Sequence, residues 1–416
     1  MSDNKSSTPR MNRTIVLPFD QANYHKIVED PKWYRQKLDE FIDFMPELFP
    51  AEVIEGYWIK EKRISKKLKV PSRRIIIGST SYTVRPAHVM PYHTAYTDEI
   101  EKAMFLRKFG VPFWALSYVF GKDHSFWYRI EQSLGKNSIV GTTIKDHSLL
   151  PEHVVADEKH SRMRGKKVYI PTTVASQCIL GVSVTEDAGE KTLTKAYGVF
   201  KDEANDLNPA YSPVSVNTDG WKATINAWKS IFPSISVLCC FLHVFIKIRD
   251  RSQKKYRDFF NVVAESVWNC YKAENKATFS QRVRRLYESV KKQNVPQVIL
   301  NPIKKMKDNI SKYSKAYDLP GCHRTSNMID RLMQRMDRHL FSTFYFHGSL
   351  ASAKLSIRGW ALIHNFAPCN PTTVKKHNGW RSPAEKINQF RYHDCWLQNM
   401  LISASLGGFR NPPPNP

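Results

Sequence analysis

The chain has 416 residues, of which 42% are hydrophobic and 24% are charged. These proportions exclude a wholly disordered chain, and the length is too great for one simple core, so we expect two to four structural units. Lysine and arginine number 63 against 38 aspartate and glutamate residues, a net charge of +25. Such an excess attracts polyanions, and we favour nucleic acid over ribosomal or membrane surfaces as the partner.

Targeting signals and cysteine usage indicate a cytoplasmic protein. The polar start, Met1–Arg13, lacks the apolar core of a signal peptide. The most apolar stretch, Ile235–Ile248, is interrupted by His243 and Lys247 and is too short to cross a bilayer. Seven cysteines without regular spacing fit free thiols in a reducing compartment.

The first 90 residues are expected to divide into a loose arm and a small folded unit. Residues 1–18 hold few apolar side chains, so we expect a disordered basic arm. Residues 19–90 are predicted to form an N-terminal DNA-contacting unit, with a helix over Leu38–Phe49 and a strand over Arg73–Ile77.

A cluster of basic residues lies between that helix and that strand, and it includes Lys66 and Lys67. A solvated surface is one interpretation of this cluster. Contact with DNA phosphates is the other, because basic clusters commonly follow a nucleic-acid backbone.

Residues 91–149 are predicted to form a helix-turn-helix, because glycines separate three short helical segments. These segments are Asp98–Phe109, Pro112–Phe120 and Ser125–Leu134. On the last segment, Phe126, Ile130 and Leu134 recur every four residues and are expected to pack inward. The outward face would then present Tyr128, Arg129 and Gln132 to base edges. An ordinary three-helix bundle is the alternative.

Residues 150–348 are predicted to form an α/β domain with a mixed sheet. Its expected strands are Val154–Asp157, Lys167–Val174, Cys178–Thr185, Val214–Asp219 and Ile235–Leu242, with helices over Glu190–Asn205 and Trp221–Ile231. Asp157 ends the first strand and Asp219 ends the fourth. If these strands are parallel neighbours, both carboxylates point into one crevice at the sheet edge.

Two carboxylates held this close repel each other, and divalent cations remove that repulsion. Mg²⁺ prefers carboxylate and phosphate oxygens, and two ions about 3.5–4 Å apart can hold the attacking and leaving oxygens of a phosphodiester. Asp330, near the start of a helix predicted over Thr325–Leu340, is the candidate third ligand.

Each of these carboxylates has a plainer interpretation. Asp219 precedes a glycine and could be a turn residue or a helix cap, and Glu158 could be the ligand in place of Asp157. Asp330 could pair with Arg331 or Arg335, or could stabilise the start of its helix.

A strongly basic helical insertion is expected at about 245–320, and residues 349–416 are expected to form a mixed extension with a disordered tail. The insertion has helical patterns over Tyr256–Lys272 and Phe279–Lys292. Its candidate contacts to the DNA backbone are Lys254, Lys255, Arg284 and Arg285.

Cys240 and His243 have a spacing that could begin a zinc site, for which Cys322 and His323 could supply two more ligands. The two pairs are far apart in the chain and neither has a conventional partner spacing, which argues against zinc. A buried small thiol and a satisfied core histidine are the plainer interpretations.

Several motifs together resemble DDE-type transposases of the Mutator-like group of insertion sequences. They are Thr218-Asp219-Gly220, Phe232-Pro233, Cys240-x-x-His243, Asn327-x-x-Asp330, Phe346-His347-Gly348, Arg358–Leu362, Asn365-Phe366, Ser382–Glu385 and Trp396–Gly408. The resemblance covers about residues 150–408 and is only architectural before them. It implies an RNase H-like fold interrupted by a helical insertion.

The resemblance also implies an activity and a site. It implies two Mg²⁺ (or Mn²⁺) ions held by Asp157, Asp219 and Asp330, cleavage at transposon ends, and transfer of the freed 3′-hydroxyl to target DNA. The family usually has glutamate in the third place, so Asp337 is an alternative to Asp330. Cys240 and His243 would be a signature beside the site.

The implied partner is double-stranded DNA, bound by a homo-oligomer in the bacterial nucleoid. Two rival functions remain open. One is a catalytically inactive DNA-binding protein derived from a transposase. The other is a different RNase H-like endonuclease or integrase.

Overall fold

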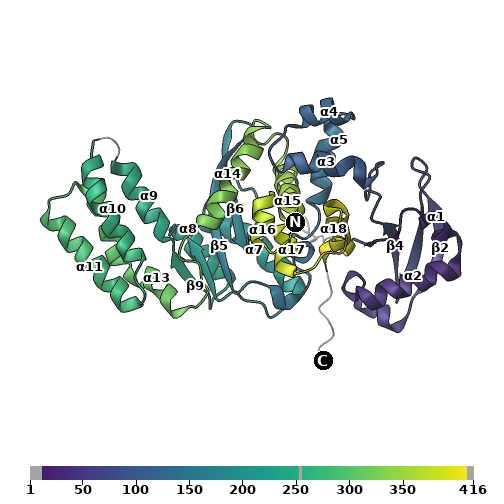
Figure 1. Ribbon diagram of the computed structural model, residues 1–416, viewed down its shortest axis with the longest axis horizontal. Coiled ribbons are helices and arrows are strands. Elements are labelled where there is room, and N and C mark those ends of the chain that lie inside the picture. The colour runs from purple at the N-terminus through teal and green to yellow at the C-terminus, as the bar shows by residue number, and fades with distance from the viewer. Residues whose placement is uncertain (1–11, 253–254, 410–416) are drawn as a thin grey trace, which may run out of the picture.

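Two β-sheets and a separate block of helices follow one another along the molecule (Figure 1). The computed structural model describes residues 12–252 and 255–409. The chain is an α/β protein, as expected. Most of the expected arm and tail, residues 1–11 and 411–416, lies outside the described residues. None of the helices in the described part combines the length and apolar character needed to cross a lipid bilayer.

The N-terminal unit is a four-stranded sheet covered by two helices, at the opposite end of the molecule from the helical block (Figure 1). The strands lie in the order β1 (Thr14–Leu17), β4 (Thr80–Pro86), β3 (Pro71–Ile77), β2 (Trp58–Ile64), with α1 (Tyr24–Glu29), α2 (Pro31–Phe44), η1 (Pro46–Leu48) and η2 (Ala51–Glu55). The prediction of an arm over residues 1–18 is wrong for Thr14–Leu17, which is buried and pairs with β4. The helix predicted over Leu38–Phe49 begins earlier, because the Asp30 side chain caps α2 by accepting from Lys32 N and Trp33 N.

Three helices form as predicted between residues 97 and 134, and Ile130 and Leu134 of the last one pack inward as expected, but its predicted outward face is wrong for two of three residues. The helices of this segment are α3 (Thr97–Arg107), α4 (Phe113–Phe120), α5 (His124–Leu134), α6 (Ile139–Thr143) and η3 (His147–Leu149). Tyr128 and Gln132 do not face outward, because α15 (Leu350–Phe366) covers that side of α5. Both side chains hydrogen-bond to Ser352, at 2.7 Å from Tyr128 Oη and 3.2 Å from Gln132 Nε2 to the Ser352 carbonyl. Arg129 alone of the three is exposed.

The central five-stranded sheet is mixed, with the strand order β7-β6-β5-β8-β9. Its elements are β5 (His153–Met163), β6 (Lys166–Ala175), β7 (Cys178–Val182), α7 (Glu190–Leu207), β8 (Ser215–Thr218), α8 (Lys222–Ile231) and β9 (Ser236–Cys239). β5, β6 and β7 are antiparallel, whereas β8 runs parallel to both β5 and β9, as predicted. β5 extends six residues beyond the predicted end at Asp157, while β7 and β9 are shorter than predicted.

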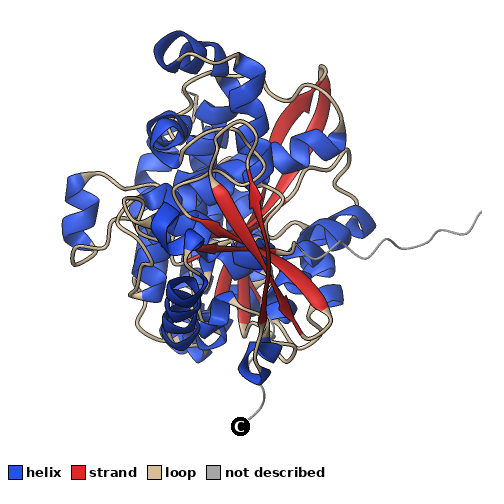
Figure 2. Ribbon diagram, turned by 90° about the vertical axis from the view of Figure 1, so that its right-hand side faces the viewer, coloured by secondary structure: helices blue, strands red, loops and turns tan. Residues whose placement is uncertain are grey.

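Alternate residues of β5 belong to two different cores. Val154 and Ala156 pack with α7 and α8 on one face of the sheet. Val155 faces the other side, where α14 (Asn327–Phe341) and α15 pack. Figure 2 shows the strands surrounded by helices. Asp157 therefore lies on the side of α14 and Glu158 on the side of α7 and α8.

The predicted helical insertion is a block with its own core at one end of the molecule (Figure 1). It comprises α9 (Phe241–Ser252), α10 (Arg257–Tyr271), α11 (Lys276–Lys292), α12 (Gln297–Asp308), α13 (Ile310–Ser314) and η4 (Lys315–Asp318). Its buried residues include Val263, Val283 and Ile303, and its chain returns to the sheet through α14.

The C-terminal extension is helical rather than mixed, and it closes onto the N-terminal unit. After α15 come α16 (Pro371–Lys376), α17 (Pro383–Asn388), α18 (Trp396–Ser403) and η5 (Ser405–Gly408). Ser405 Oγ donates to the carbonyl of Val16 at 3.0 Å and accepts from its N–H at 2.9 Å. One continuous core joins β1, α5, β5, α14, α15 and α18, so the predicted divisions at residues 90, 150 and 348 are not separate cores.

Helices α5 and α15 contact each other backbone to backbone. A Cβ atom on Gly359 would lie 2.0 Å from the Glu131 carbonyl oxygen, and one on Gly135 would lie 1.9 Å from that of Leu355. Only glycine permits this approach. The contact fixes α15, which also packs on the central sheet.

Gly359→Ala is expected to destabilise the protein by about 1–3 kcal/mol or more, because two backbones must separate. Gly198, inside α7, is the matched control, since a Cβ there meets no atom within 4 Å. Gly198→Ala is expected to stabilise the fold by roughly 0.5–1 kcal/mol. Chemical denaturation of both variants measures the two effects. Equal stabilities would contradict the close contact.

Candidate metal centre

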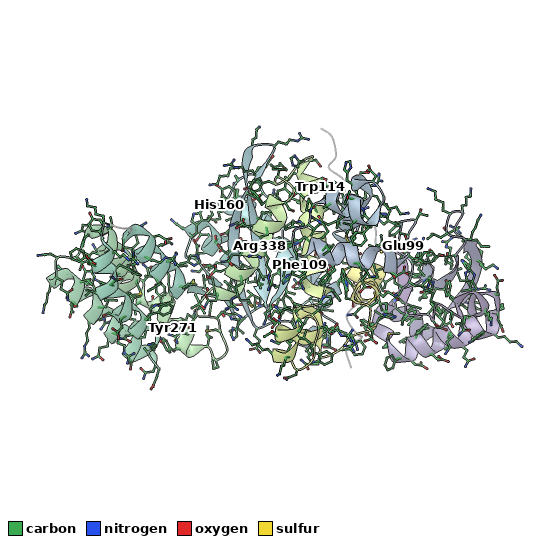
Figure 3. All side chains as sticks on the ribbon, turned by 45° about the horizontal axis from the view of Figure 1, so that its top comes forward. Glu99, Phe109, Trp114, His160, Tyr271 and Arg338 are labelled. Atoms are coloured by element: carbon green, nitrogen blue, oxygen red, sulfur yellow. The ribbon has the colours of Figure 1, made fainter. Side chains whose placement is uncertain are left out.

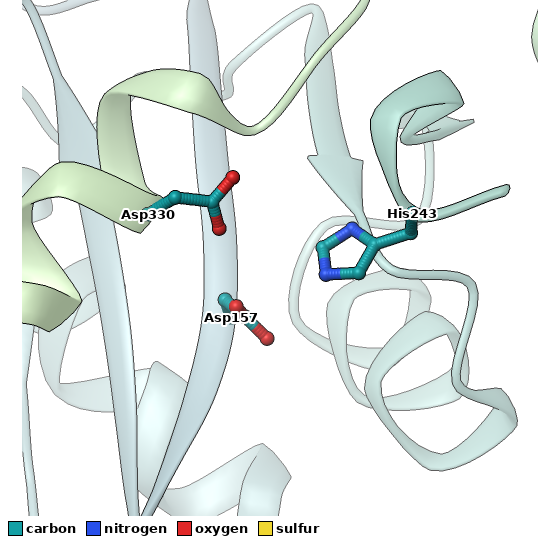
Figure 4. A group of neighbouring side chains, drawn as sticks. All are labelled: Asp157, His243 and Asp330. Atoms are coloured by element: carbon teal, nitrogen blue, oxygen red, sulfur yellow. The ribbon is translucent and has the colours of Figure 1, made fainter. Parts of the chain in front are cut away.

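Three side chains from three elements converge on the face of the central sheet that α14 covers: Asp157 from β5, His243 from α9 and Asp330 from α14 (Figure 4). Each offers one ligand atom, and these atoms all lie within 4.8 Å of one another. All three residues are partly buried. Segments far apart in the chain thus meet at one point that can hold a cation.

Asp157 is placed by the alternation of β5. It lies in the middle of the strand and not at its end, opposite Thr172 of β6. Its Oδ1 accepts from the N–H of Glu158 at 2.9 Å. The rigid paired strand fixes the carboxylate beneath α14.

Asp219 follows β8 directly and lies beside the convergence point without belonging to it. Residues Val155 and Asn217 are partners in the parallel pairing of β5 and β8, so Asp157 and Asp219 each lie two residues further on. Asp219 Oδ1 accepts from Trp221 N at 2.8 Å, which is the capping role that a turn residue would have. The carboxylate is still close enough to raise the pKa values of Asp157 and His243.

The structure places Asp330, and not Asp337, with Asp157. Asp330 Oδ2 accepts from Ser326 Oγ at 2.9 Å within the first turn of α14. Asp337, two turns further on, accepts from Lys159 Nζ at 2.6 Å. Among the described residues no ion pair joins Asp330 to Arg331 or Arg335.

Cys240 connects the end of β9 to the start of the Asp330 helix. Its sulfur accepts from Ser326 N at 3.1 Å and lies 3.2 Å from Ser326 Oγ, the same hydroxyl that donates to Asp330. Its N–H donates to the Thr218 carbonyl at 2.7 Å. One thiol therefore orients the helix start that carries Asp330, next to the strand tip that carries Asp219.

The zinc alternative does not fit this arrangement. The Cys322 thiol donates to the Ala316 carbonyl at 3.3 Å. Within the described ranges, Cys240, Cys322 and His323 do not form a ligand group. His243 turns instead toward the carboxylates, a placement that the Cys-x-x-His spacing on one helical turn could have indicated.

The electrostatics of the site are those of crowded carboxylates partly compensated by an imidazolium. Burial raises the pKa of the Asp157 carboxyl, His243 lowers it, and Asp219 and Asp330 raise it further. Burial lowers the pKa of His243, but the Cys240 sulfur and the carboxylates of Asp157 and Asp219 outweigh this and raise it to about 9. His243 is therefore positively charged at neutral pH.

Glu158, the alternative to Asp157, faces the opposite side of the sheet. Its Oε1 accepts from Tyr197 Oη at 2.7 Å and from Thr224 Oγ1 at 2.6 Å. Burial raises its pKa to about 7. This glutamate ties β5 to α7 and α8, and it does not point at Asp330.

The donor set suits a divalent cation. Asp157 and Asp330 offer the carboxylate oxygens that Mg²⁺ and Mn²⁺ prefer, and Asp219 lies at the adjacent strand tip. Two buried carboxylates this close need a positive charge between them. His243 meets part of that need as an imidazolium, and it would have to lose its proton before its imidazole could bind a metal directly.

The candidate DNA-binding residues are spread along the molecule. Lys66 and Lys67 are exposed in the turn between β2 and β3, and Lys255, Arg284 and Arg285 are exposed on the helical block. Lys254 lies outside the described residues. Tyr128 and Gln132 are held against α15.

Comparison of the sequence with known protein families and with curated proteins finds no match.

Removing a carboxylate at the convergence point is expected to weaken cation binding. Ser326→Ala removes only a hydrogen bond to a ligand and should lower Mn²⁺ affinity by roughly 10–100-fold. Asp330→Asn removes the ligand itself and should lower Mn²⁺ affinity by more than this. Asp337→Asn removes a carboxylate from the same helix and should leave the affinity unchanged. Calorimetric titration measures all three. An equal loss in the Asp330 and Asp337 variants would contradict the site.

Proposed function

We propose that the protein is a DNA transposase that binds transposon ends and carries out metal-dependent phosphodiester cleavage and strand transfer. The observation that carries the proposal is the convergence of Asp157 and Asp330, with Asp219 at the adjoining strand tip. A strand, a second parallel strand and a helix supply these acids in chain order. We propose that Asp157, Asp219 and Asp330 are the metal ligands.

The topology supports an RNase H-like catalytic domain. The central sheet combines three antiparallel strands with two parallel ones, and helices cover both faces. The helical block enters between β9, which ends at Cys239, and the helix that carries Asp330. This position of the block supports the interrupted RNase H-like fold that the sequence resemblance implies.

The roles of the residues follow from their positions. When bound, Mg²⁺ or Mn²⁺ would activate the attacking water or 3′-hydroxyl and neutralise charge on the phosphodiester. Asp157 and Asp330 would hold this charge in place between β5 and α14. Cys240 and Ser326 would keep Asp330 aimed at Asp157. His243 would supply a further positive charge beside the DNA phosphate.

The charge of the chain supports a DNA partner. A net charge of +25 favours association with a polyanion through release of counterions. Exposed basic residues occur at the β2–β3 turn, at Arg129 and on the helical block. We propose that transposon-end and target duplexes follow these surfaces, with the protein acting as a homo-oligomer on DNA in the bacterial nucleoid.

Asp219→Asn is expected to lower metal-dependent cleavage of transposon-end DNA by roughly 10²-fold or more, because the strand-tip ligand is lost. Binding of the same duplex should persist. Asp202→Asn, on the exposed surface of α7, makes the same change of charge and should leave cleavage intact. Gel analysis of labelled duplex measures both.

Two results would replace this proposal with a rival. DNA binding without cleavage by the unaltered protein would indicate a catalytically inactive relative. Cleavage without joining of the freed end to a second duplex would indicate another RNase H-like nuclease or integrase.

Replacing both Arg284 and Arg285 by alanine is expected to flatten the salt dependence of DNA affinity. Each lost phosphate contact lowers the slope of log affinity against log salt by about 0.9. The slope for the double variant should therefore be smaller by roughly 1–2. Lys375 and Lys376 are an equally exposed basic pair on α16 and serve as the control. Equal changes in the two double variants would rule out a specific contact by the helical block.

A further inference from the structure

A cavity opens beside Asp219, with a volume of about 410 Å³. Its lining comes from the outer part of β5, from β6, from the loop between β8 and α8, and from α9. The side chains that line the cavity are those of His160, Lys167, Tyr169, Asp219, Trp221 and Lys247. Figure 3 labels His160, which lies between the helical block and α4, the helix that carries Trp114. We call this cavity the Trp221 pocket.

Aromatic rings form one wall of the Trp221 pocket. The rings of Tyr169 and Trp221 lie 6.4 Å apart at 44°, and His160 meets Tyr169 edge-on at 5.0 Å. Trp221 remains 38% exposed, although the large aromatic residues Trp228 and Tyr197 nearby are buried. A flat, accessible tryptophan next to a proposed catalytic carboxylate can stack on a planar ligand.

Positive charge faces this aromatic wall. Lys167 Nζ lies 4.8 Å from the centroid of the Tyr169 ring. Lys247 lies one turn after His243 on α9, so the same helix faces both the carboxylates and the pocket. In the described ranges of the chain, neither Lys167 nor Lys247 forms an ion pair with an acidic residue. Their charges are thus available for an anionic ligand.

We propose that the Trp221 pocket binds an unpaired nucleotide of the DNA strand next to the phosphodiester at the carboxylates. The base would stack on Trp221 and Tyr169, and its phosphate would lie between Lys167 and Lys247. The volume is within the range of small-ligand sites, and stacking with a basic groove is how proteins hold single-stranded nucleic acid. The base must be unpaired, because a base pair within a duplex does not expose its face. The position of this nucleotide rests on the proposed function.

The test compares two DNA probes in the presence of a chelator, so that no cleavage occurs. One probe is a blunt duplex of fixed sequence, and the other is the same duplex with a short 3′ overhang of thymidines. Trp221→Ala is expected to lower affinity for the overhang probe by roughly 5- to 100-fold, from the loss of base stacking, without changing affinity for the blunt probe. Trp221→Phe, which keeps a ring, should retain most of the affinity.

Trp58→Ala is the matched control, because Trp58 is an exposed tryptophan in the N-terminal sheet, far from the pocket. It should leave the ratio of the two affinities unchanged. The proposal is overturned if Trp221→Ala binds the overhang probe as tightly as the unaltered protein does. An equal loss on both probes also overturns it.

Two further measurements cover a Trp221→Ala variant that fails to fold. Lys247→Ala, at an exposed position, should lower the salt slope for the overhang probe by about 0.7 more than for the blunt probe. With 2-aminopurine at the first unpaired position, the unaltered protein should quench its fluorescence through stacking. Equal slopes, or no quenching, would contradict nucleotide binding in the pocket.

The results distinguish a failure of the nucleotide site from a failure of the proposed function. Discrimination between the probes without any metal-dependent cleavage would leave the nucleotide site standing and remove the transposase. Cleavage that depends on Asp219, with no probe discrimination by Trp221, would do the reverse.

Discussion

The mutual repulsion of carboxylates between the central sheet and α14 is the constraint on which the rest of the structure depends. Asp157 and Asp330 offer oxygen atoms within 4.8 Å of each other in a partly buried site, with Asp219 close by. Left alone, such groups would separate or take up protons. The fold prevents separation by mounting them on a paired strand and on a packed helix. The site therefore needs a positive charge close to the carboxylates of Asp157 and Asp330.

Residues around the site supply positive charge and hold the carboxylates in position. His243 contributes an imidazolium from α9, while the Cys240 thiol and the Ser326 hydroxyl hold the first turn of α14 in place. Asp337, two turns further along the same helix, pairs with Lys159 and lies outside the site. The helical block, with its own core, brings α9 to the sheet edge without disturbing the strands.

Residue patterns allowed the strand tip before Asp219 to be predicted, but not the mid-strand position of Asp157. The apolar run before Asp219 and the parallel neighbourhood of β5 and β8 follow from short β-branched segments separated by helices. The full length of β5 could not be predicted from the sequence, because the outer half of the strand, Glu158–Met163, is polar. Backbone pairing with β6, and not burial, makes that half a strand.

Contacts between distant segments account for the other errors. Periodicity on α5 identifies an inward face, but it cannot reveal that α15 covers the side bearing Tyr128 and Gln132. The approach of α15 is set by glycines more than 200 residues apart in the chain. The role of Cys240 was equally hidden, since its partner Ser326 is 86 residues away. A spacing motif shows which residues share a helix turn, but not what lies across from them.

The hydroxyl of Ser405, which completes the hydrogen bonding of Val16, has a consequence for biosynthesis. These two residues are 389 positions apart, so the peptide groups of Val16 gain this partner only when nearly the whole chain has been translated, although β1 can pair with β4 much earlier. At about 5–20 residues per second, that delay is roughly 20–80 s. A prematurely terminated product would keep an unsatisfied peptide group beside its apolar interior. Cellular proteases would therefore find incomplete copies easier to open than finished ones.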